Sequence, residues 1–250
     1  MRELVIPDFA TVSLSDMKKV KLMNRIDTKF VTTEPVLTEL LRLAAGEYMA
    51  QEIDGKIILP YFTRYFDTAD CEMYHRHLHG KMPRKKIRIR EYVASETKFL
   101  EVKRKSNKGR TDKKRIPADN LSDEECAAFI LAKADYAADS LLPQIENRFN
   151  RLTLVNRDMT ERLTIDMGLR FHNTVTGIDC DLSGLVIIEL KRDGKAASPV
   201  SDILLRLRIQ PSGFSKYCMG MALTNPNVKS NLFKPRLRRF RKMLSGLSGN

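Results

Sequence analysis

The sequence contains no tryptophan, and its four cysteines, at positions 71, 126, 180 and 218, are far apart and form no CxxC pair. Isolated cysteines argue against a zinc knuckle and against a disulfide framework. The phosphate loops GxxxxGK and GxGxxG are absent as well, so a bound nucleotide would have to be held by side chains rather than by a backbone cradle. The cysteine usage favours a reducing, cytoplasmic setting.

Long hydrophobic runs are also missing. The first ten residues, MRELVIPDFA, lack the apolar core of a signal peptide, and no apolar run approaches the roughly 20 residues that span a bilayer. We therefore expect a soluble cytoplasmic chain. A chain of 250 residues can bury a large core, and no linker is visible, so we expect one domain over 1–250 with a basic C-terminal tail at 229–250.

The positive charge is concentrated in two stretches. The chain has a formal net charge of +13, residues 81–115 contain 15 Lys and Arg against 4 acidic residues, and residues 229–242 contain 7 against none. Such a distribution indicates a binding surface for phosphates, nucleic acid or acidic lipid rather than a general aid to solubility.

Charged residues alternate with apolar residues in six short segments. In an extended strand successive side chains point to opposite faces, so Arg88 and Arg90 share one face while Ile87 and Ile89 share the other. The same alternation recurs in KIRIREY (86–92), KFLEVKRK (98–105), TDKKRI (111–116), RFNRL (148–152), ERLTID (161–166) and VIIELKRD (186–193). One face of the predicted sheet therefore collects many cations and a few carboxylates.

Two interpretations of this face remain open. Half-buried antiparallel strands commonly have one solvated polar side, which is the simpler reading. Like charges on adjacent strands repel each other, however, and closure of the sheet would direct them into one cavity that an anion with many oxygens could neutralise.

The periodicity also locates the elements. We predict about eight strands, at Lys29–Thr32, Ile57–Phe66, Ile87–Val93, Phe99–Lys105, Lys113–Pro117, Ile145–Leu152, Arg162–Phe171 and Leu185–Lys191. Helices that cover the sheet are predicted after Ser13 (13–24), after Thr33 to Leu43, after a capping box of Ser122 and Glu125, and from Ser198 to Leu207. The histidine run at 75–79 could face a metal if extended, but we favour a loop or turn.

At this point the sequence resembles a known family. The ordered segments RIDTKF, YFDTADCEMY, KIRIREY, FLEVKRK, KKR, RFNR, RLTID, IIELK and FSKY resemble the vacuolar transporter chaperone (VTC) domain, the polyphosphate polymerase branch of the triphosphate tunnel metalloenzymes, over about residues 20–222. The resemblance implies an α+β fold: an antiparallel eight-stranded β-barrel tunnel with helices packed outside, whose lumen holds a triphosphate or polyphosphate chain.

The resemblance also implies roles for individual residues. The cations expected to hold phosphoryl oxygens are Lys29, Arg88, Arg90, Lys103, Lys113, Arg115 and Arg151, with Ser215 and Lys216 of FSKY, and the catalytic set is Arg88, Arg90, Lys103 and Arg151. Glu189 of IIELK matches the metal-binding glutamate and implies Mn²⁺ or Mg²⁺. Glu101 could add a ligand, but we favour a salt-bridge partner that holds Lys103.

Three positions depart from the family pattern. Gly213 stands where relatives often have a lysine, Asp27 replaces a glutamate, and Phe149 replaces a tyrosine. A lost cation or hydroxyl would change contacts to the transition state but would leave a strand intact, so these departures bear on turnover more than on fold.

The expected reaction is metal-dependent phosphoryl transfer from ATP to a growing polyphosphate chain. The alternatives are hydrolysis of tripolyphosphate or a nucleoside triphosphate by the same fold, and a non-catalytic polyphosphate-binding module. Nucleic acid is not an expected partner, because the basic segment 81–92 offers only Tyr92 as a stacking platform. The tail LFKPRLRRFRKML (232–244) has apolar residues at helical spacing between cations, which suits an acidic membrane or a separate membrane-protein partner.

Overall fold

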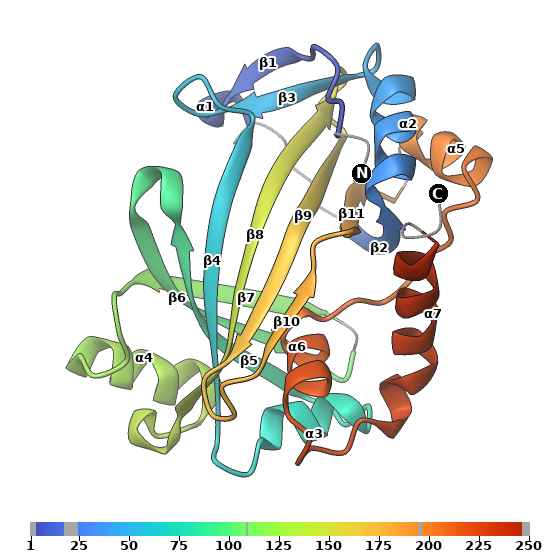
Figure 1. The fold of residues 1–250 in the computed structure, drawn as a ribbon. Helices are drawn as coiled ribbons and strands as arrows, with labels where there is room; N and C mark the ends of the chain where they lie inside the picture. Colours follow the sequence, from blue (N-terminus) through green and yellow to red (C-terminus); the bar gives the residue numbers. More distant parts are fainter. Residues whose placement is uncertain (1–3, 18–24, 109, 195–196, 247–250) are drawn as a thin grey trace.

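A large antiparallel sheet forms the centre of the protein (Figure 1). The structure is a computed structural model, and it describes residues 4–17, 25–108, 110–194 and 197–246. Eight strands follow one another across the sheet in the order β2 (Arg25–Thr33), β11 (Leu185–Asp193), β9 (Glu161–Asn173), β8 (Leu142–Asn156), β4 (Ile58–Asp67), β5 (Arg84–Tyr92), β6 (Thr97–Lys105) and β7 (Thr111–Pro117). Three shorter strands extend it: β1 (Ala10–Ser13) pairs in parallel with β3 (Tyr48–Glu52), which pairs with β8, and β10 (Asp179–Leu182) pairs with β9.

The eight strands of this path are the eight that alternation predicted, and the α+β class is confirmed. The closed eight-stranded barrel is not what the structure contains. The sheet has eleven strands, and over the described ranges no ladder joins its two end strands, β2 and β7. β7 reads TDKKRIP, and six of its seven residues, all except Ile116, are exposed. Charged side chains on an edge strand oppose further pairing, which accounts for the open end.

Helices cover the outer face of the sheet, as predicted. α4 (Glu124–Ala134) packs Cys126 and Ile130 against Ile87 and Leu100 of the β5–β6 pair. A second outer core lies beneath α2 (Glu34–Ala44) and α5 (Pro199–Arg206), which cover the apolar side chains of β8, β9 and β11. The isoleucines that alternate with Arg88 and Arg90 are therefore buried on the outer side, and the arginines point to the inner side.

A third core fills part of the inner side. α3 (Glu72–Leu78), α6 (Lys216–Thr224) and α7 (Lys234–Ser245) pack there on Ile145, Phe171 and Ile187 of the sheet (Figure 1). α6 approaches the sheet closely at Gly220, where an added Cβ would lie 2.9 Å from side-chain atoms of both Ile145 and Phe171. This contact fixes the depth of α6 and so the position of its first residues.

Several local predictions have clear outcomes. The helix after Thr33 and the helix after Ser198 are confirmed as α2 and α5. The helix predicted at 13–24 is described only as α1 (Leu14–Met17), since 18–24 lie outside the described residues. The capping box is wrong, because α4 begins after Asp123 and the Ser122 hydroxyl donates to Asn120 instead.

The histidine run forms a helix rather than the expected loop or turn. His75 and His77 lie within α3, and His79 follows its last residue. The short helix α3 starts after Cys71, whose φ of 58° is in the left-handed region, and Asp67 accepts hydrogen bonds from the backbone N–H groups of Met73 and Tyr74. This carboxylate supports the start of α3, which the histidine pattern alone could not indicate.

The basic tail is part of the fold. α7 is helical as its spacing indicated, but Leu237 and Phe240 are buried in the inner core instead of facing a membrane or partner. The prediction that the tail acts through an apolar face of its own is therefore wrong, and an association through its exposed arginines stays a prediction. In the part of the chain that the structure describes, no helix has the length and apolar character needed to cross a membrane.

The outer core yields a stability test. Ile87 is fully buried under α4, so Ile87→Asp should lower the free energy of unfolding by about 3 kcal/mol or more, because a charge would enter an apolar layer without a partner. Val93→Asp is the matched control, since Val93 is 40% exposed and should cost about 0.5 kcal/mol or less. Denaturant titration measures both, and equal costs would contradict this assignment of the two faces.

Candidate functional site

Strand register brings the charged side chains onto one surface. Arg88 is paired with Tyr65 of β4 and Glu101 of β6, and Lys103 is paired with Lys86 of β5 and Lys113 of β7. Directly paired residues share a face of a sheet, so these side chains all lie on the inner side. The cationic inner face comprises Lys29, Lys86, Arg88, Arg90, Lys103, Lys113, Arg115, Arg151, Lys191 and, from α6, Lys216, together with the carboxylates Glu101, Asp166 and Glu189.

The sheet curls so that distant strands face each other across this surface. Lys103 on β6 interacts electrostatically with Glu189 on β11 and Lys29 on β2, although four strands lie between β6 and β11 in the sheet order. Lys86 on β5 likewise interacts with Lys29. The charges of the inner face therefore act on one shared volume.

Each of the three carboxylates Glu101, Asp166 and Glu189 is shared by two cations. Glu101, which has no exposed side-chain surface, accepts from Arg88 at 2.6 Å and from Lys113 at 2.8 Å. Glu189 accepts from Lys29 at 2.6 Å and lies 3.3 Å from Lys191. Asp166 completes the series, with Arg151 Nε at 2.6 Å and Lys216 on its other oxygen.

Three further cations that are buried or half-buried have no carboxylate partner within the described ranges: Lys86, Arg90 and Lys103. Arg90 is 8% exposed, and its Nε has no hydrogen-bond partner. Thr63, the residue paired with Arg90 on β4, is fully buried and its hydroxyl is also unsatisfied. A buried cation without a partner is costly, so the arrangement calls for an anion that the protein itself does not supply.

The first turn of α6 lies on the inner side of the sheet and contacts this face. Ser215 caps α6 by accepting from the Cys218 N–H at 3.2 Å, and it also accepts from Lys86 Nζ at 2.9 Å. Lys216 donates to Asp166 of β9, and Tyr217 donates to the buried Asp67 at 2.5 Å. α6 thus bridges β5 and β9 and presents its amino-terminal end to the cationic surface, a position that favours negative charge.

Burial and the crowding of cations together shift several pKa values. Burial, reinforced by Lys29 and Lys86, lowers the pKa of Lys103 to about 8, and burial lowers the pKa of Lys216 to about 8 despite its contact with Asp166. Burial alone would raise the pKa of Glu189, but Lys191 and Lys29 hold it well below its usual range. The carboxylates are therefore ionised, and two lysines are poised to change charge when an anion binds.

The structure places all ten sequence-predicted site residues on the inner face: Lys29, Arg88, Arg90, Lys103, Lys113, Arg115, Arg151, Glu189, Ser215 and Lys216. Their roles stay predictions. Glu101 is a salt-bridge partner, as favoured, but of Arg88 and Lys113 rather than of Lys103. The prediction missed Lys86, Asp166 and Lys191, although Lys86 lies two residues before Arg88 and Lys191 lies two after Glu189.

The donor set for a divalent cation is sparse. Among the described residues no group of three His, Cys, Asp or Glu side chains could hold a metal ion. Glu189 is an ionised hard oxygen ligand beside the unpaired Lys103, and Mg²⁺ is commonly bound through one or two carboxylates together with substrate phosphates. The residues present fit a metal that arrives with a phosphate ligand, not one held by a protein cage.

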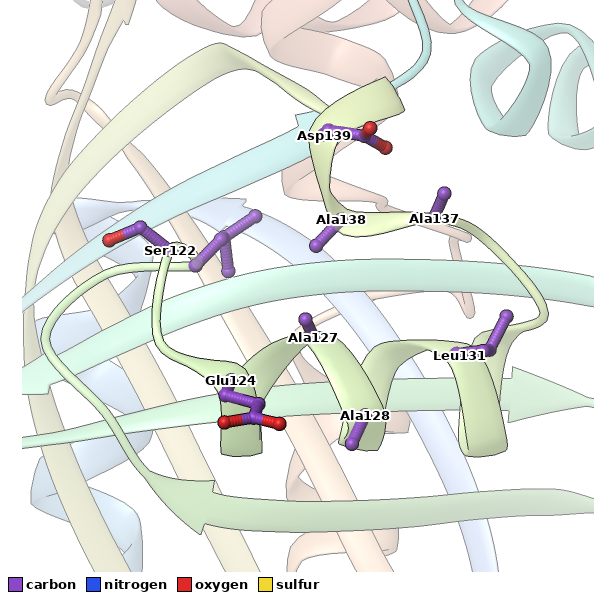
Figure 2. Close-up of a pocket in the computed structure, with 9 residues that line it drawn as sticks. Ser122, Glu124, Ala127, Ala128, Leu131, Ala137, Ala138 and Asp139 are labelled. Atoms are coloured by element: carbon purple, nitrogen blue, oxygen red, sulfur yellow. The ribbon is translucent and has the colours of Figure 1, made fainter.

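A separate groove lies on the outer side, beside α4 and the short helix η2 (Ala138–Ser140). It has a volume of about 670 Å³ and is lined by Leu121, Ser122, Glu124, Ala127, Ala128, Leu131, Ala137, Ala138 and Asp139 (Figure 2). The lining is mostly aliphatic and includes no residue of the cationic inner face. It lacks the cations that the charge pattern requires, so the inner face is the candidate site.

The site is a curled antiparallel sheet with an inner face of excess cations. The family model of the VTC domain matches residues 24–225, and the chain belongs to this family. A comparison with curated proteins found no match.

One solved structure shares the fold, and a second is similar more loosely. The putative adenylyl cyclase HpAC1 from Hippeastrum, described as having a dominant triphosphatase activity, is 16% identical, with a TM-score of 0.51 over 81% of this chain and 98% of that chain. A putative adenylate cyclase from Bacillus halodurans is 14% identical, with a TM-score of 0.46 over 77% and 96%. The fold is the triphosphate tunnel (CYTH-like) fold, which confirms the resemblance drawn from the motifs.

Arg88 and Arg90 should affect stability in opposite directions. Arg88 neutralises the fully buried Glu101, so Arg88→Met should lower the free energy of unfolding by about 2 kcal/mol. Arg90 has no anionic partner, so Arg90→Met should raise it by about 1 kcal/mol in the ligand-free protein. Chemical denaturation compares them, and loss of stability in both variants would show that Arg90 is neutralised within the protein.

Binding of a polyanion should take up protons near pH 8. The folded-state pKa of Lys103 and Lys216, about 8, lies below the ordinary value of about 10.4, so the unfolded chain binds more protons between these values and ligand-free stability should rise with pH across that window. Bound tripolyphosphate would raise both pKa values, so the rise of stability with pH would be reversed and the protein would take up protons on binding. Calorimetry at about pH 8 in two buffers of different ionisation enthalpy measures the uptake, which Lys103→Met should reduce. Binding without proton uptake would contradict the shifts.

Proposed function

We propose that the protein is a polyphosphate polymerase, which transfers the γ-phosphoryl group of ATP to the end of an inorganic polyphosphate chain and releases ADP. The observation that carries the proposal is the presence of three buried or half-buried cations without carboxylate partners, Lys86, Arg90 and Lys103, on a face where Glu101, Asp166 and Glu189 are already shared. A chain of phosphates supplies closely spaced negative charges along its length, which suits cations on neighbouring strands.

The chemistry needs no nucleophilic side chain. A terminal phosphate oxygen of the acceptor attacks the γ-phosphorus of ATP, and the bond to the β-phosphate oxygen breaks as ADP leaves. The transition state is loose and carries charge on the equatorial oxygens, so catalysis consists largely of positioning and electrostatic stabilisation. Arg88, Arg90 and Arg151 would orient phosphate oxygens with their planar guanidinium groups, and Lys29, Lys103, Lys113 and Lys216 would neutralise charge.

A divalent cation, Mn²⁺ or Mg²⁺, fits this proposal through Glu189 and the phosphates of the substrate. When bound, such an ion withdraws charge from the phosphoryl oxygens. Glu189 has to be ionised for this purpose, and Lys29 and Lys191 keep it so. These two lysines also hold the carboxylate at the edge of the phosphate-binding surface.

Hydrolysis of tripolyphosphate or a nucleoside triphosphate is the second candidate. It is favoured by the fold shared with HpAC1, which is described as having a dominant triphosphatase activity. The same cations would hold the triphosphate, and water would replace the polyphosphate acceptor. A binding module without catalysis is the remaining alternative, and nucleic acid is not proposed as a ligand. A cytoplasmic location, with membrane association through a partner, is part of the proposal.

Glu189→Gln tests the proposal because it removes one anionic oxygen and no apolar packing. With ATP, Mn²⁺ and a short polyphosphate primer, the wild type should release ADP and lengthen the primer, and the variant should lose about 10- to 100-fold or more of that rate. Gel analysis of chain length and ADP assays measure the two products.

The neighbouring substitution Glu161→Gln is a matched control. Glu161 is fully buried on β9 and accepts from Tyr48 on the outer side, away from the phosphates. This control should change stability but not the rate per folded molecule. Phosphate release without chain growth would favour the triphosphatase, and binding without turnover would leave the binding module.

A further inference from the structure

The inner side of strands β5, β6 and β7 changes in character from one end to the other. Along β5 the inward side chains are basic from Arg84 to Arg90 and end at Tyr92. Along β6 the corresponding series runs from Lys105 and Lys103 to Phe99. The cationic surface thus has a basic end and an aromatic end.

Four rings make up the aromatic end. Tyr61 stacks on Phe149 with centroids 5.3 Å apart, and Tyr92 lies 5.1 Å from Tyr61 and 5.9 Å from Phe99. Tyr61 and Phe149 are buried, whereas Tyr92 and Phe99 are only half-buried. The first pair forms a fixed base, and the second pair keeps surface that a ligand can cover.

Arg115 of β7 extends this aromatic surface. Its guanidinium lies 4.4 Å from the centroid of the Phe99 ring and donates to the Tyr92 hydroxyl at 3.4 Å. Arg115 is exposed, and no carboxylate in the described part of the chain pairs with it. A planar guanidinium stacked on a ring offers a flat, cationic face to solvent, and nucleobases stack on both aromatic rings and guanidinium planes.

The aromatic end directly adjoins the unsatisfied arginine. Arg90 is the residue paired with Phe99, it lies one inward position from Tyr92, and its guanidinium is 5.8 Å from the Tyr61 ring centroid. Its Nε is unpartnered at 8% exposure. A ligand that joined an anion to a flat aromatic group would satisfy Arg90 and cover Phe99 at the same time.

We infer that Tyr92, Phe99 and Arg115 form a nucleobase subsite that places the donor nucleoside triphosphate at the aromatic end of the cationic inner face, with its phosphates directed along β5 toward Arg84. This inference rests on the proposed function. It gives Arg115 a different partner from the one predicted from the sequence, since its flat surface faces a base rather than a phosphate. A stacking subsite of this kind favours purines over pyrimidines and reads few base edges.

Two conservative variants test the subsite. Phe99→Leu keeps an apolar side chain but removes the aromatic ring. Arg115→Lys keeps the positive charge but removes the planar guanidinium group. Both should weaken ATP binding by about 10-fold, within the range for loss of one stacked base, and should leave tripolyphosphate binding within about 2-fold. Competition calorimetry with ATP, UTP and tripolyphosphate measures the constants, and the wild type should prefer ATP to UTP.

The opposite face of the sheet supplies a matched control. Phe62 on β4 also has an arginine over its ring, with the Arg148 guanidinium 4.7 Å from the centroid, but it faces outward. Phe62→Leu should leave ATP and tripolyphosphate binding unchanged.

The outcomes separate the subsite from the proposed function. Equal weakening of ATP and tripolyphosphate, unchanged ATP binding in both variants, or equal affinity of the wild type for ATP and tripolyphosphate would overturn the nucleobase subsite and leave the phosphate site standing. Failure of the wild type to bind tripolyphosphate would overturn both. If the Phe99→Leu variant does not fold, the Arg115→Lys variant alone tests the nucleobase subsite, because Arg115 is exposed and its replacement should not disturb the fold.

Discussion

Two cations share each of the carboxylates Glu101, Asp166 and Glu189, and most of the site's properties depend on this two-to-one ratio. The ratio holds the carboxylates in the ionised state and fixes the orientation of Arg88, Arg151 and Lys29 before any ligand arrives. Burial lowers the pKa of Lys103, and the surplus of positive charge that the ratio leaves lowers it further. A site neutralised one-to-one would be more stable when empty and would have little affinity for an anion. The protein therefore has electrostatic repulsion in the free state, which the proposed polyanion would relieve.

Several strands could be predicted because one physical rule governs them. Along much of β5, β6, β9 and β11 an apolar side lies under a helix and a polar side faces the site, so a period of two is visible in KIRIREY and VIIELKRD. Features decided by tertiary contacts could not be read in this way. The open edge at β7 and the burial of Leu237 and Phe240 depend on partners far away in the sequence, and the helix at the histidine run depends on Asp67, which lies outside that run. The short strands β1, β3 and β10 show little alternation and were missed.

The site residues were found through motifs and spacing together. Arg88, Arg90 and Glu189 combine a family motif with the correct face of a strand, and the structure brings them onto one surface. Lys86 and Lys191 are indicated only by their spacing at every second residue of a strand. Asp166 ends the alternating segment ERLTID, but this pattern does not indicate that two cations bind it. Which cation lacks a partner cannot be seen in a sequence, because it depends on the pairing of strands. Arg88 and Arg90 look equivalent in RIR, yet only Arg88 has a carboxylate.

The division of each strand between two faces has a consequence for the divergence of such proteins. Side chains at even positions of β5, such as Lys86 and Arg88, contact the site, and those at odd positions, such as Ile87 and Ile89, contact the helix core. A substitution at one set hardly disturbs the packing of the other set, since effects at separate sites are nearly additive. Specificity for a polyanion can therefore drift through single inward changes while the scaffold stays under constant selection, and low overall identity is compatible with one retained architecture.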